Sequence, residues 1–244
     1  NYRSMFKSEY GELVICHDSP NCWRKDTFEY YKKSRKIKQA ESKVDWNSIY
    51  KTLQVIQEEI KDNFPYINIK IPRTEADDII FALCKEFQTT EKILILSNDK
   101  DFKQLQKWDN VYQYSITKKS FLVCEDPEND LIEHIIRGDT SDGIPNILSD
   151  SDTFVVSSKR QKRLTKNILS DISESIRITG NPPEYCQDNW DRNKFLIDLE
   201  NVPIDLYKEI INQYNSTTHG TRNNMLNYMI ENRLNNLIEN LEDF

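Results

Sequence analysis

Short apolar segments alternate with amphipathic helical patterns through the first half of the chain. Apolar runs typical of buried strands occupy residues 13–17, 66–71, 92–96 and 111–114. Helical patterns lie between them, at residues 46–64, 75–87 and 102–106. This alternation predicts an α/β fold, a mostly parallel sheet flanked by helices. Because parallel strands end at the same edge of a sheet, we expect an active site at the carboxyl ends of the strands.

Two of these helices carry clear sequence signals. In the segment 46–64, Ile49, Leu53 and Ile56 recur three or four residues apart, which predicts a helix facing a core and ending before Pro65. Thr74 is expected to cap the helix that follows the second strand.

The character of the sequence changes after Asn146, where strand patterns give way to polar sequence and then to helical patterns at 206–214 and 225–241. We therefore predict a catalytic α/β domain over residues 1–146 and a smaller helical domain over residues 147–244. Residues 149–162 and 180–183 contain few apolar anchors or a Gly/Pro break, and we expect mobile loops there.

Composition excludes several classes of protein. The mean hydropathy is -0.73 and no run approaches the roughly 20 apolar residues of a membrane span. The five glycines form no phosphate-binding loop, which disfavours nucleotide-driven motors and dinucleotide enzymes. No secretion signal is visible, and the five cysteines form no C-x-x-C pair, so we expect reduced thiols and a cytoplasmic location, in the host cell for a viral protein.

Carboxylates gather at the ends of the predicted strands and in the turn that opens the helical half. Such a cluster needs cations to offset its repulsion, and all-oxygen ligation selects hard ions such as Mg²⁺. Two ions about 3.5–4 Å apart can activate a water and stabilise the leaving oxygen in phosphodiester hydrolysis. The candidate metal ligands are Asp18, Glu75, Asp77, Asp78, Asp99, Asp101, Asp139 and Asp142.

Each acidic motif also has a structural alternative. Residues 74–77 read as a helix cap with acids favoured by the helix dipole, and Asp99 and Asp101 read as turn formers. Gly138 could end a helix, with the acids after it solvated. If Asp78 and Asp99 are ligands, we expect Asp→Asn changes there to abolish turnover and preserve stability without metal.

Two basic segments are candidates for nucleic-acid contact, because cations can hold phosphates while tyrosines stack on bases. The alternatives are a solvated amphipathic helix for the first and an ordinary surface loop for the second. The first segment offers Arg24, Lys25, Tyr30, Tyr31, Lys32, Lys33, Arg35 and Lys36. The second offers Lys159, Arg160, Lys162, Arg163 and Lys166.

Four ordered motifs resemble those of the 5′ nucleases, or flap endonucleases, and most closely the ribonuclease H type of T-even bacteriophages. They comprise residues 16–35, 75–78, 97–102 and 138–146. The resemblance implies a PIN-like α/β domain in which the eight candidate ligands hold two or more Mg²⁺ ions, with Mn²⁺ as a substitute. It assigns catalytic roles to Lys32, Arg35 and Asp99, and places Tyr31, Lys32 and Arg35 in a helical arch that orders the 5′ strand. The segment from Asp139 would open a helix-turn-helix-type DNA-binding region.

By the same resemblance, the activities would be 5′ to 3′ exonuclease, flap endonuclease and ribonuclease H, removing RNA primers in lagging-strand DNA replication. The substrates would be branched or flapped DNA and RNA–DNA hybrids, and a sliding clamp and a single-strand-binding protein would be partners. Two alternatives stay open: a catalytically silent subunit that binds branched DNA, and a PIN-like ribonuclease acting on single-stranded RNA.

The chain departs from the family pattern at two places. After Pro145 it runs on without the family's second glycine-rich turn, as in the phage branch. It also begins without the strand and metal-binding Asp that precede the position of Asp18 in the family. We therefore expect that this strand was left out or is supplied by a second polypeptide.

Overall fold

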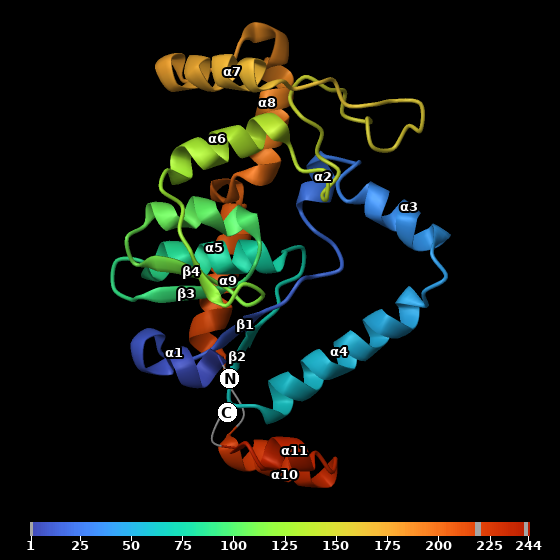
Figure 1. The fold of residues 1–244 in the computed structure, drawn as a ribbon. Helices are drawn as coiled ribbons and strands as arrows, with labels where there is room; N and C mark the ends of the chain where they lie inside the picture. The colour runs from blue at the N-terminus through green and yellow to red at the C-terminus, as the bar shows by residue number, and fades with distance from the viewer. Residues whose placement is uncertain (1, 218–220, 242–243) are drawn as a thin grey trace. The chain divides into compact units, whose positions relative to one another are not determined.

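The structure, a computed structural model, describes residues 2–217, 221–241 and 244 (Figure 1). The chain forms two compact units, each assembled from stretches that are separate in the sequence. Unit 1 comprises Asn1–Pro20, Lys43–Ile93 and Ile204–Phe244, and unit 2 comprises Asn21–Ser42 and Leu94–Pro203. The single boundary predicted after Asn146 falls inside unit 2, so these units do not follow it.

Unit 1 combines a parallel strand pair with helices. β1 (Val14–Cys16) and β2 (Ile67–Ile69) pair in parallel, with Ile15 opposite Asn68. Both strands lie within the segments predicted as strands, and their parallel pairing confirms that part of the prediction. The helices of unit 1 are α1 (Tyr2–Tyr10), α4 (Trp46–Asn63), α5 (Ala76–Phe87), α9 (Ile204–Ser216), α10 (Arg222–Glu231) and α11 (Asn235–Ile238).

The core of unit 1 joins segments from both ends of the chain. Phe64 and Tyr66 are buried together with Met225 and Met229 of α10. Ile15 of β1 packs against this cluster, and α5 packs against α9. Burial of such side chains is the main stabilising contribution, roughly 1.5–3 kcal/mol for each large apolar side chain.

The predicted helical segment 225–241 is two helices, α10 and α11. The break follows Asn232, because Arg233 adopts a left-handed backbone with φ of 55° that an α-helix cannot accommodate. Periodicity of apolar residues continued across this break and so did not reveal it.

The position of α4 in the sequence was predicted correctly, but its burial was not. Asp45 caps its N-terminus by accepting a hydrogen bond from the backbone of Ser48 at 3.0 Å. Ile49, Leu53 and Ile56, expected to face a core, are 39%, 48% and 43% exposed. Only the last turns of α4 approach the core cluster. An amphipathic pattern predicts a helix but does not supply a partner for every turn of its apolar face.

Unit 2 contains a three-stranded sheet in the order β3-β4-β5. β3 (Ile93–Leu96) and β4 (Val111–Ser115) match predicted strands, whereas β5 (Ser120–Leu122) was not predicted and pairs antiparallel with β4. The helices of unit 2 are α2 (Arg24–Thr27), α3 (Lys33–Glu41), η1 (Lys100–Lys107), α6 (Pro127–Arg137), α7 (Lys166–Thr179), η2 (Glu184–Cys186), α8 (Gln187–Ile197) and η3 (Leu199–Asn201).

A buried amide ties the helices of unit 2 to the turn after α6. Asn193 of α8 is fully buried, and its Nδ2 donates to the carbonyls of Ile135 and Pro145, each at 2.8 Å. Arg192 also donates to the Pro145 carbonyl, at 3.1 Å. Together these bonds satisfy buried carbonyls and hold the turn in place. No helix in the described part of the chain is long and apolar enough to cross a membrane.

Candidate metal centre and nucleic-acid interface

The eight predicted metal ligands fall into two sets, four in each unit. We call Asp18, Glu75, Asp77 and Asp78 the unit 1 acidic group, and Asp99, Asp101, Asp139 and Asp142 the unit 2 acidic group.

The unit 1 acidic group lies around the N-terminus of α5. Asp18, directly after β1, accepts a hydrogen bond from the backbone N of Ala76 at 2.8 Å. Asp77 lies in the first turn of α5. Burial raises the pKa of Cys16, the last residue of β1, to about 12, and the charge of Asp77 adds to this rise. The expected gathering of acids at the ends of these two strands is therefore observed within unit 1.

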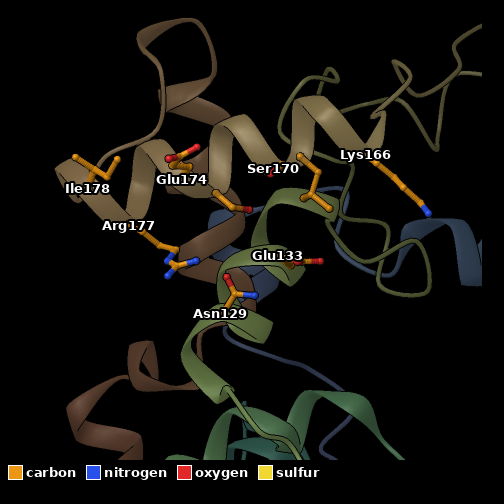
Figure 2. Close-up of a pocket in the computed structure, with 9 residues that line it drawn as sticks. Asn129, Glu133, Lys166, Ser170, Glu174, Arg177 and Ile178 are labelled. Carbon is orange, nitrogen blue, oxygen red and sulfur yellow. The ribbon is translucent and has the colours of Figure 1, made fainter.

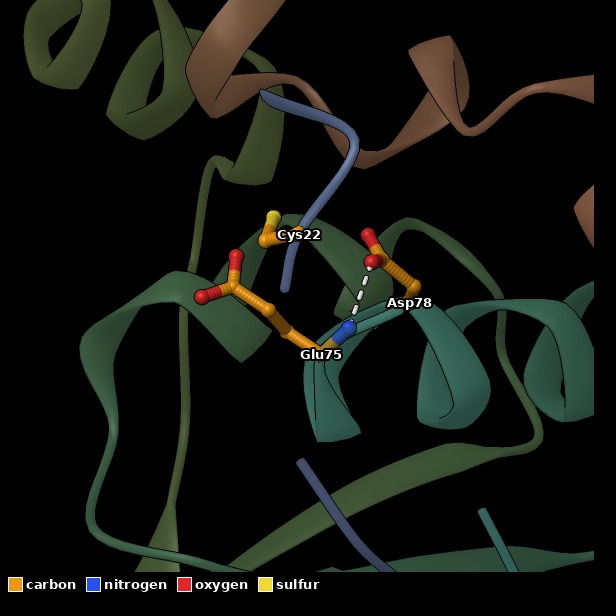
Figure 3. Close-up of side chains that lie close together, drawn as sticks. All are labelled: Cys22, Glu75 and Asp78. Atoms are coloured by element: carbon orange, nitrogen blue, oxygen red, sulfur yellow. Dashed lines mark hydrogen bonds between the residues drawn. The ribbon is translucent and has the colours of Figure 1, made fainter. Parts of the chain in front are cut away.

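A capping box formed by two of these acids begins α5. The Glu75 side chain accepts from the backbone N of Asp78, and Asp78 Oδ2 accepts from the backbone N of Glu75 at 2.9 Å (Figure 3). Both residues are buried, at 6% and 0% exposure. The predicted cap, Thr74, instead donates its hydroxyl to the carbonyl of Ile71, because Glu75 takes the capping position.

In the unit 2 acidic group, Asp99 and Asp101 begin η1 after β3. Asp99 Oδ1 accepts from the backbone N of Asp101 at 3.0 Å, so the turn-forming alternative is also realised. Asp101 is mostly buried, and its Oδ1 has no hydrogen-bond partner. Burial and the charges of the neighbouring acids, opposed by His134, raise the pKa of Asp101 to about 6.

Asp139 and Asp142 lie in the turn that follows Gly138. Asp139 Oδ1 accepts from the backbone N and the hydroxyl of Ser141, at 2.7 and 2.6 Å. Its Oδ2 lies 3.0 Å from Lys100 Nζ. Despite burial, the hydrogen bonds from His134, Ser141 and Lys100 lower the pKa of Asp139.

His134 joins this group and was missed as a site residue. Its Nε2 lies 3.4 Å from Asp139 Oδ2 and its Nδ1 lies 3.6 Å from Asp101 Oδ1. The only signal in the sequence was its position near the C-terminus of a helix leading into the Asp139 turn, and three scattered histidines did not indicate a ligand.

The donor atoms of the unit 2 acidic group suit a divalent cation. One ligand atom each from Asp101, His134 and Asp139 lies within 4.8 Å of the others. A buried carboxylate oxygen without a hydrogen bond is costly unless a cation or proton accompanies it. These residues therefore fit the metal ion that the acidic motifs led us to expect.

The first basic segment supplies cations to Asp142. Tyr31 donates its hydroxyl to Asp142 Oδ2 at 2.8 Å, and Lys32 Nζ lies 3.6 Å from the same oxygen. Arg35 donates to the other carboxylate oxygen and to the carbonyl of Ser141. Burial raises the pKa of Asp142, and the charges of Lys32 and Arg35 oppose this rise.

Two residues of this segment are buried in the interior of unit 2. Arg24 is buried and donates from Nε to the carbonyl of Leu196 at 2.9 Å, and Tyr31 is only 5% exposed. As the structure stands, both side chains pack in the protein interior and are not accessible to a phosphate or a base. Lys33, Arg35 and Lys36 are exposed, and Lys25 and Tyr30 are partly exposed.

The second basic segment lies at the start of α7 and on the loop before it, whose two ends are joined by hydrogen bonds. Asn146 Nδ2 donates to the carbonyl of Lys162 at 2.9 Å, and the backbone N of Lys162 donates to Ser149 Oγ at 2.8 Å. Lys159 is paired with Asp150 and Asp152. The remaining cations of this run are exposed: Arg160, Lys162, Arg163 and Lys166.

A separate surface cavity of about 590 Å³ lies between α6 and α7 (Figure 2). Asn129 and Glu133 line it from α6, and Ser170, Ser173 and Arg177 line it from α7. Lys166 also lines it, but none of the eight predicted metal ligands does.

Comparison with known proteins gives matches along the whole chain. Residues 2–131 match the family model described as 5′-3′ exonuclease, N-terminal resolvase-like domain. Residues 125–244 match the model described as T4 RNase H, C terminal.

Individual relatives agree with these families. The chain is 31% identical over 245 aligned positions to the ribonuclease H of Enterobacteria phage T4, covering 96% of this chain and 80% of that protein. It is 32% identical to a 5′-3′ exonuclease of Buchnera aphidicola over 59% of this chain and 49% of that protein.

Solved structures show the same fold. A phage T5 5′-exonuclease with bound zinc ions aligns with a TM-score of 0.61 at 18% identity, over 83% of each chain. A phage T5 flap endonuclease in a complex with DNA and metal ions aligns with the same TM-score and identity, over 84% of this chain and 85% of that one. The expected α/β architecture with a helical C-terminal part is confirmed, and the chain belongs to the 5′-3′ exonuclease family, in the branch that carries the C-terminal part of T4 ribonuclease H.

Proposed function

We propose that this protein is a Mg²⁺-dependent, structure-specific 5′ nuclease with 5′ to 3′ exonuclease, flap endonuclease and ribonuclease H activities. The observation that carries the proposal is the unit 2 acidic group. It holds a buried carboxylate oxygen without a hydrogen bond at the end of β3, in a chain matched throughout by the family. Carboxylates within each acidic group would hold divalent ions, which when bound would supply an activated water and stabilise the leaving oxygen.

The protein's own residues would prepare the reacting groups. Ser141 orients Asp139 by donating two hydrogen bonds to one of its oxygens, which leaves the other oxygen for a cation. Lys32 and Arg35 neutralise Asp142 and are held beside it. When a substrate phosphate arrives, these two cations can turn to it, because a guanidinium binds phosphate as well as carboxylate.

We assign nucleic-acid contact to the accessible members of the two basic segments. Lys25, Lys33 and Lys36 would hold phosphates of the 5′ strand, and Tyr30 would stack on a base. The exposed cations of the loop and α7 would hold the duplex backbone. Arg24 and Tyr31 would serve by keeping this segment folded.

The biological role follows the relatives. T4 ribonuclease H is a phage protein. We propose that this chain removes RNA primers during lagging-strand replication in the host cytoplasm. A sliding clamp and a single-strand-binding protein remain proposed partners.

Cleavage assays test this proposal directly. A labelled 5′-flap duplex and an RNA–DNA hybrid are incubated with the protein in Mg²⁺ or EDTA. The variants Asp99→Asn and Asp101→Asn are compared with the control Asp188→Asn, an exposed residue of α8. We expect Mg²⁺-dependent cleavage that both site variants lose and the control retains. Binding without cleavage by the unaltered chain would instead indicate a silent branch-binding subunit, and cleavage of single-stranded RNA alone a PIN-like ribonuclease.

A further inference from the structure

His134 sits between two acids of the unit 2 acidic group, where the family pattern in the sequence gave no expectation of a nitrogen ligand. Its side chain is 11% exposed, and it extends from the last turns of α6. One ring nitrogen faces Asp139 and the other faces Asp101. The arrangement of protons on the ring follows from these two neighbours.

The contact with Asp139 sets the tautomer of the ring. Asp139 Oδ1 is saturated by Ser141 and by the backbone N of Asp142, so Oδ2 is the atom that meets His134 Nε2, at 3.4 Å. An ionised carboxylate only accepts hydrogen bonds, and therefore Nε2 carries the proton. In the neutral ring, Nδ1 is then left with a lone pair.

That lone pair points toward another acceptor. His134 Nδ1 lies 3.6 Å from Asp101 Oδ1, which is buried and has no hydrogen-bond partner. Two acceptors that face each other without a hydrogen bond need a cation or a shared proton. Ions bound at about 2.1 Å to nitrogen and oxygen ligands hold those atoms roughly 3–4 Å apart, as observed here.

The contact between the other ring nitrogen of His134, Nε2, and Asp139 matches a recurrent feature of metal sites. A histidine that ligates a metal almost always donates its other N–H to a carboxylate or carbonyl, which fixes the ring and raises its basicity. Asp139 is positioned to accept this hydrogen bond. Lys100, which also meets Asp139 Oδ2, has an exposed side chain and can turn to solvent when an ion enters.

We propose that His134 Nδ1 and Asp101 Oδ1 are ligands of one divalent ion, making this position a mixed nitrogen and oxygen site. The inference rests on the proposed metal-dependent function and adds a ligand to it. Because imidazole suits Co²⁺, Zn²⁺ and the other later transition metals better than Mg²⁺, this position should prefer those metals relative to an all-carboxylate site.

Pulsed electron paramagnetic resonance of the full chain with Mn²⁺ alone tests the inference without relying on turnover. We expect a ¹⁴N coupling in the bound Mn²⁺ signal that changes to ¹⁵N in protein labelled with ¹⁵N-histidine. His134→Gln should abolish the coupling and weaken binding of Co²⁺ roughly tenfold while changing Mg²⁺ binding less. Asp101→Asn, which keeps the ring, should weaken the coupling, and circular dichroism checks that both variants fold.

The outcomes separate the two proposals. Bound Mn²⁺ without nitrogen coupling, or coupling that persists in folded His134→Gln, overturns the ligand role of His134. If Mg²⁺-dependent cleavage is present in that case, the nuclease function stands. Nitrogen coupling lost in His134→Gln, in a protein that cleaves no substrate, supports the ligand and overturns the function. Absence of any Mn²⁺ binding overturns both, and indicates that a shared proton joins His134 to Asp101.

Discussion

The carboxylates of the two acidic groups have different kinds of hydrogen-bond and ionic partners. In unit 1, backbone N–H groups around the start of α5 do so: Asp18 accepts from Ala76, and Glu75 and Asp78 cap the helix reciprocally. In unit 2, cationic side chains contribute: Lys100 meets Asp139, and Lys32 and Arg35 meet Asp142.

Because of this difference, the unit 1 acids contribute to the stability of the fold, whereas the unit 2 acids are free to change partners during a reaction. Backbone partners cannot leave without unfolding the helix start, so the unit 1 acids stabilise the fold whether or not an ion is bound. Side-chain cations can rotate away, so the unit 2 acids can exchange partners when an ion or phosphate arrives. Substitutions in the two groups should therefore have opposite effects on stability.

The largest effect should come from the turn that carries the unit 2 acids. Gly138 has φ of 67°, and a Cβ there would lie 2.4 Å from the carbonyl oxygen of Ile144 and 2.5 Å from that of Pro145. We expect Gly138→Ala to lower the free energy of unfolding by about 3 kcal/mol or more, since the backbone must move. Urea denaturation measures this. Gly180→Ala is the control, with φ of 77° but open space at its Cβ, and should cost about 1–2 kcal/mol. Equal losses in both variants would show that backbone conformation alone matters.

Removing the unit 1 cap should destabilise the protein less, but clearly. Asp78→Ala takes away a buried carboxylate that accepts from Glu75 N, and we expect a loss of about 1–3 kcal/mol in EDTA. This reverses the expectation from sequence that neutralising Asp78 preserves stability, because a helix cap is lost together with the charge. An unchanged melting temperature would show that the capping box contributes nothing.

Neutralising Asp101 should act in the opposite direction. Its pKa is raised to about 6, so the folded state binds a proton more tightly than the unfolded state. Stability without metal should therefore fall as pH rises from about 4 through 6, and Asp101→Asn should remove this fall. At pH 7 in EDTA we expect the variant to be more stable by an amount on the order of 1 kcal/mol. Melting curves at pH 5 and pH 7 measure it, and a variant less stable than the parent at both pH values would refute the assignment.

The smallest effect concerns the cations that hold Asp142. Arg35→Ala should weaken DNA binding and reduce the slope of log affinity against log salt by about 1, because one phosphate contact is lost. Lys38→Ala on the same helix, outside the predicted contacts, is the control. Fluorescence anisotropy at several salt concentrations measures both. Equal slopes for the parent and Arg35→Ala would show that Arg35 contacts no phosphate and acts only through its bond with Asp142.

The spacing of apolar residues along short stretches of the sequence predicted most of the helices and strands. The strands around Ile15, Ile67 and Ile95, and the helix that begins at Trp46, follow from the periodicity of apolar residues, which acts over a few residues. β5 was missed because three residues beyond a short turn carry too little pattern to predict a strand.

The features that could not be predicted depend on contacts between residues far apart in the sequence. Arg24 and Tyr31 stood in a basic aromatic run, and nothing in the sequence indicated that Leu196 and Asp142 would bind them. The exposed face of α4 and the placement of His134 depend on residues far away along the chain. The acidic groups were predictable as sets at strand ends, but not which acids would cap α5.

The lysines and arginine beside the unit 2 acids mean that this protein carries its own counter-ions. Unlike a zinc finger, which unfolds when chelated, it should tolerate storage in EDTA and regain its metals on dialysis. Under the proposed function, divalent ions would control when the enzyme acts, and we expect its architecture to persist without them.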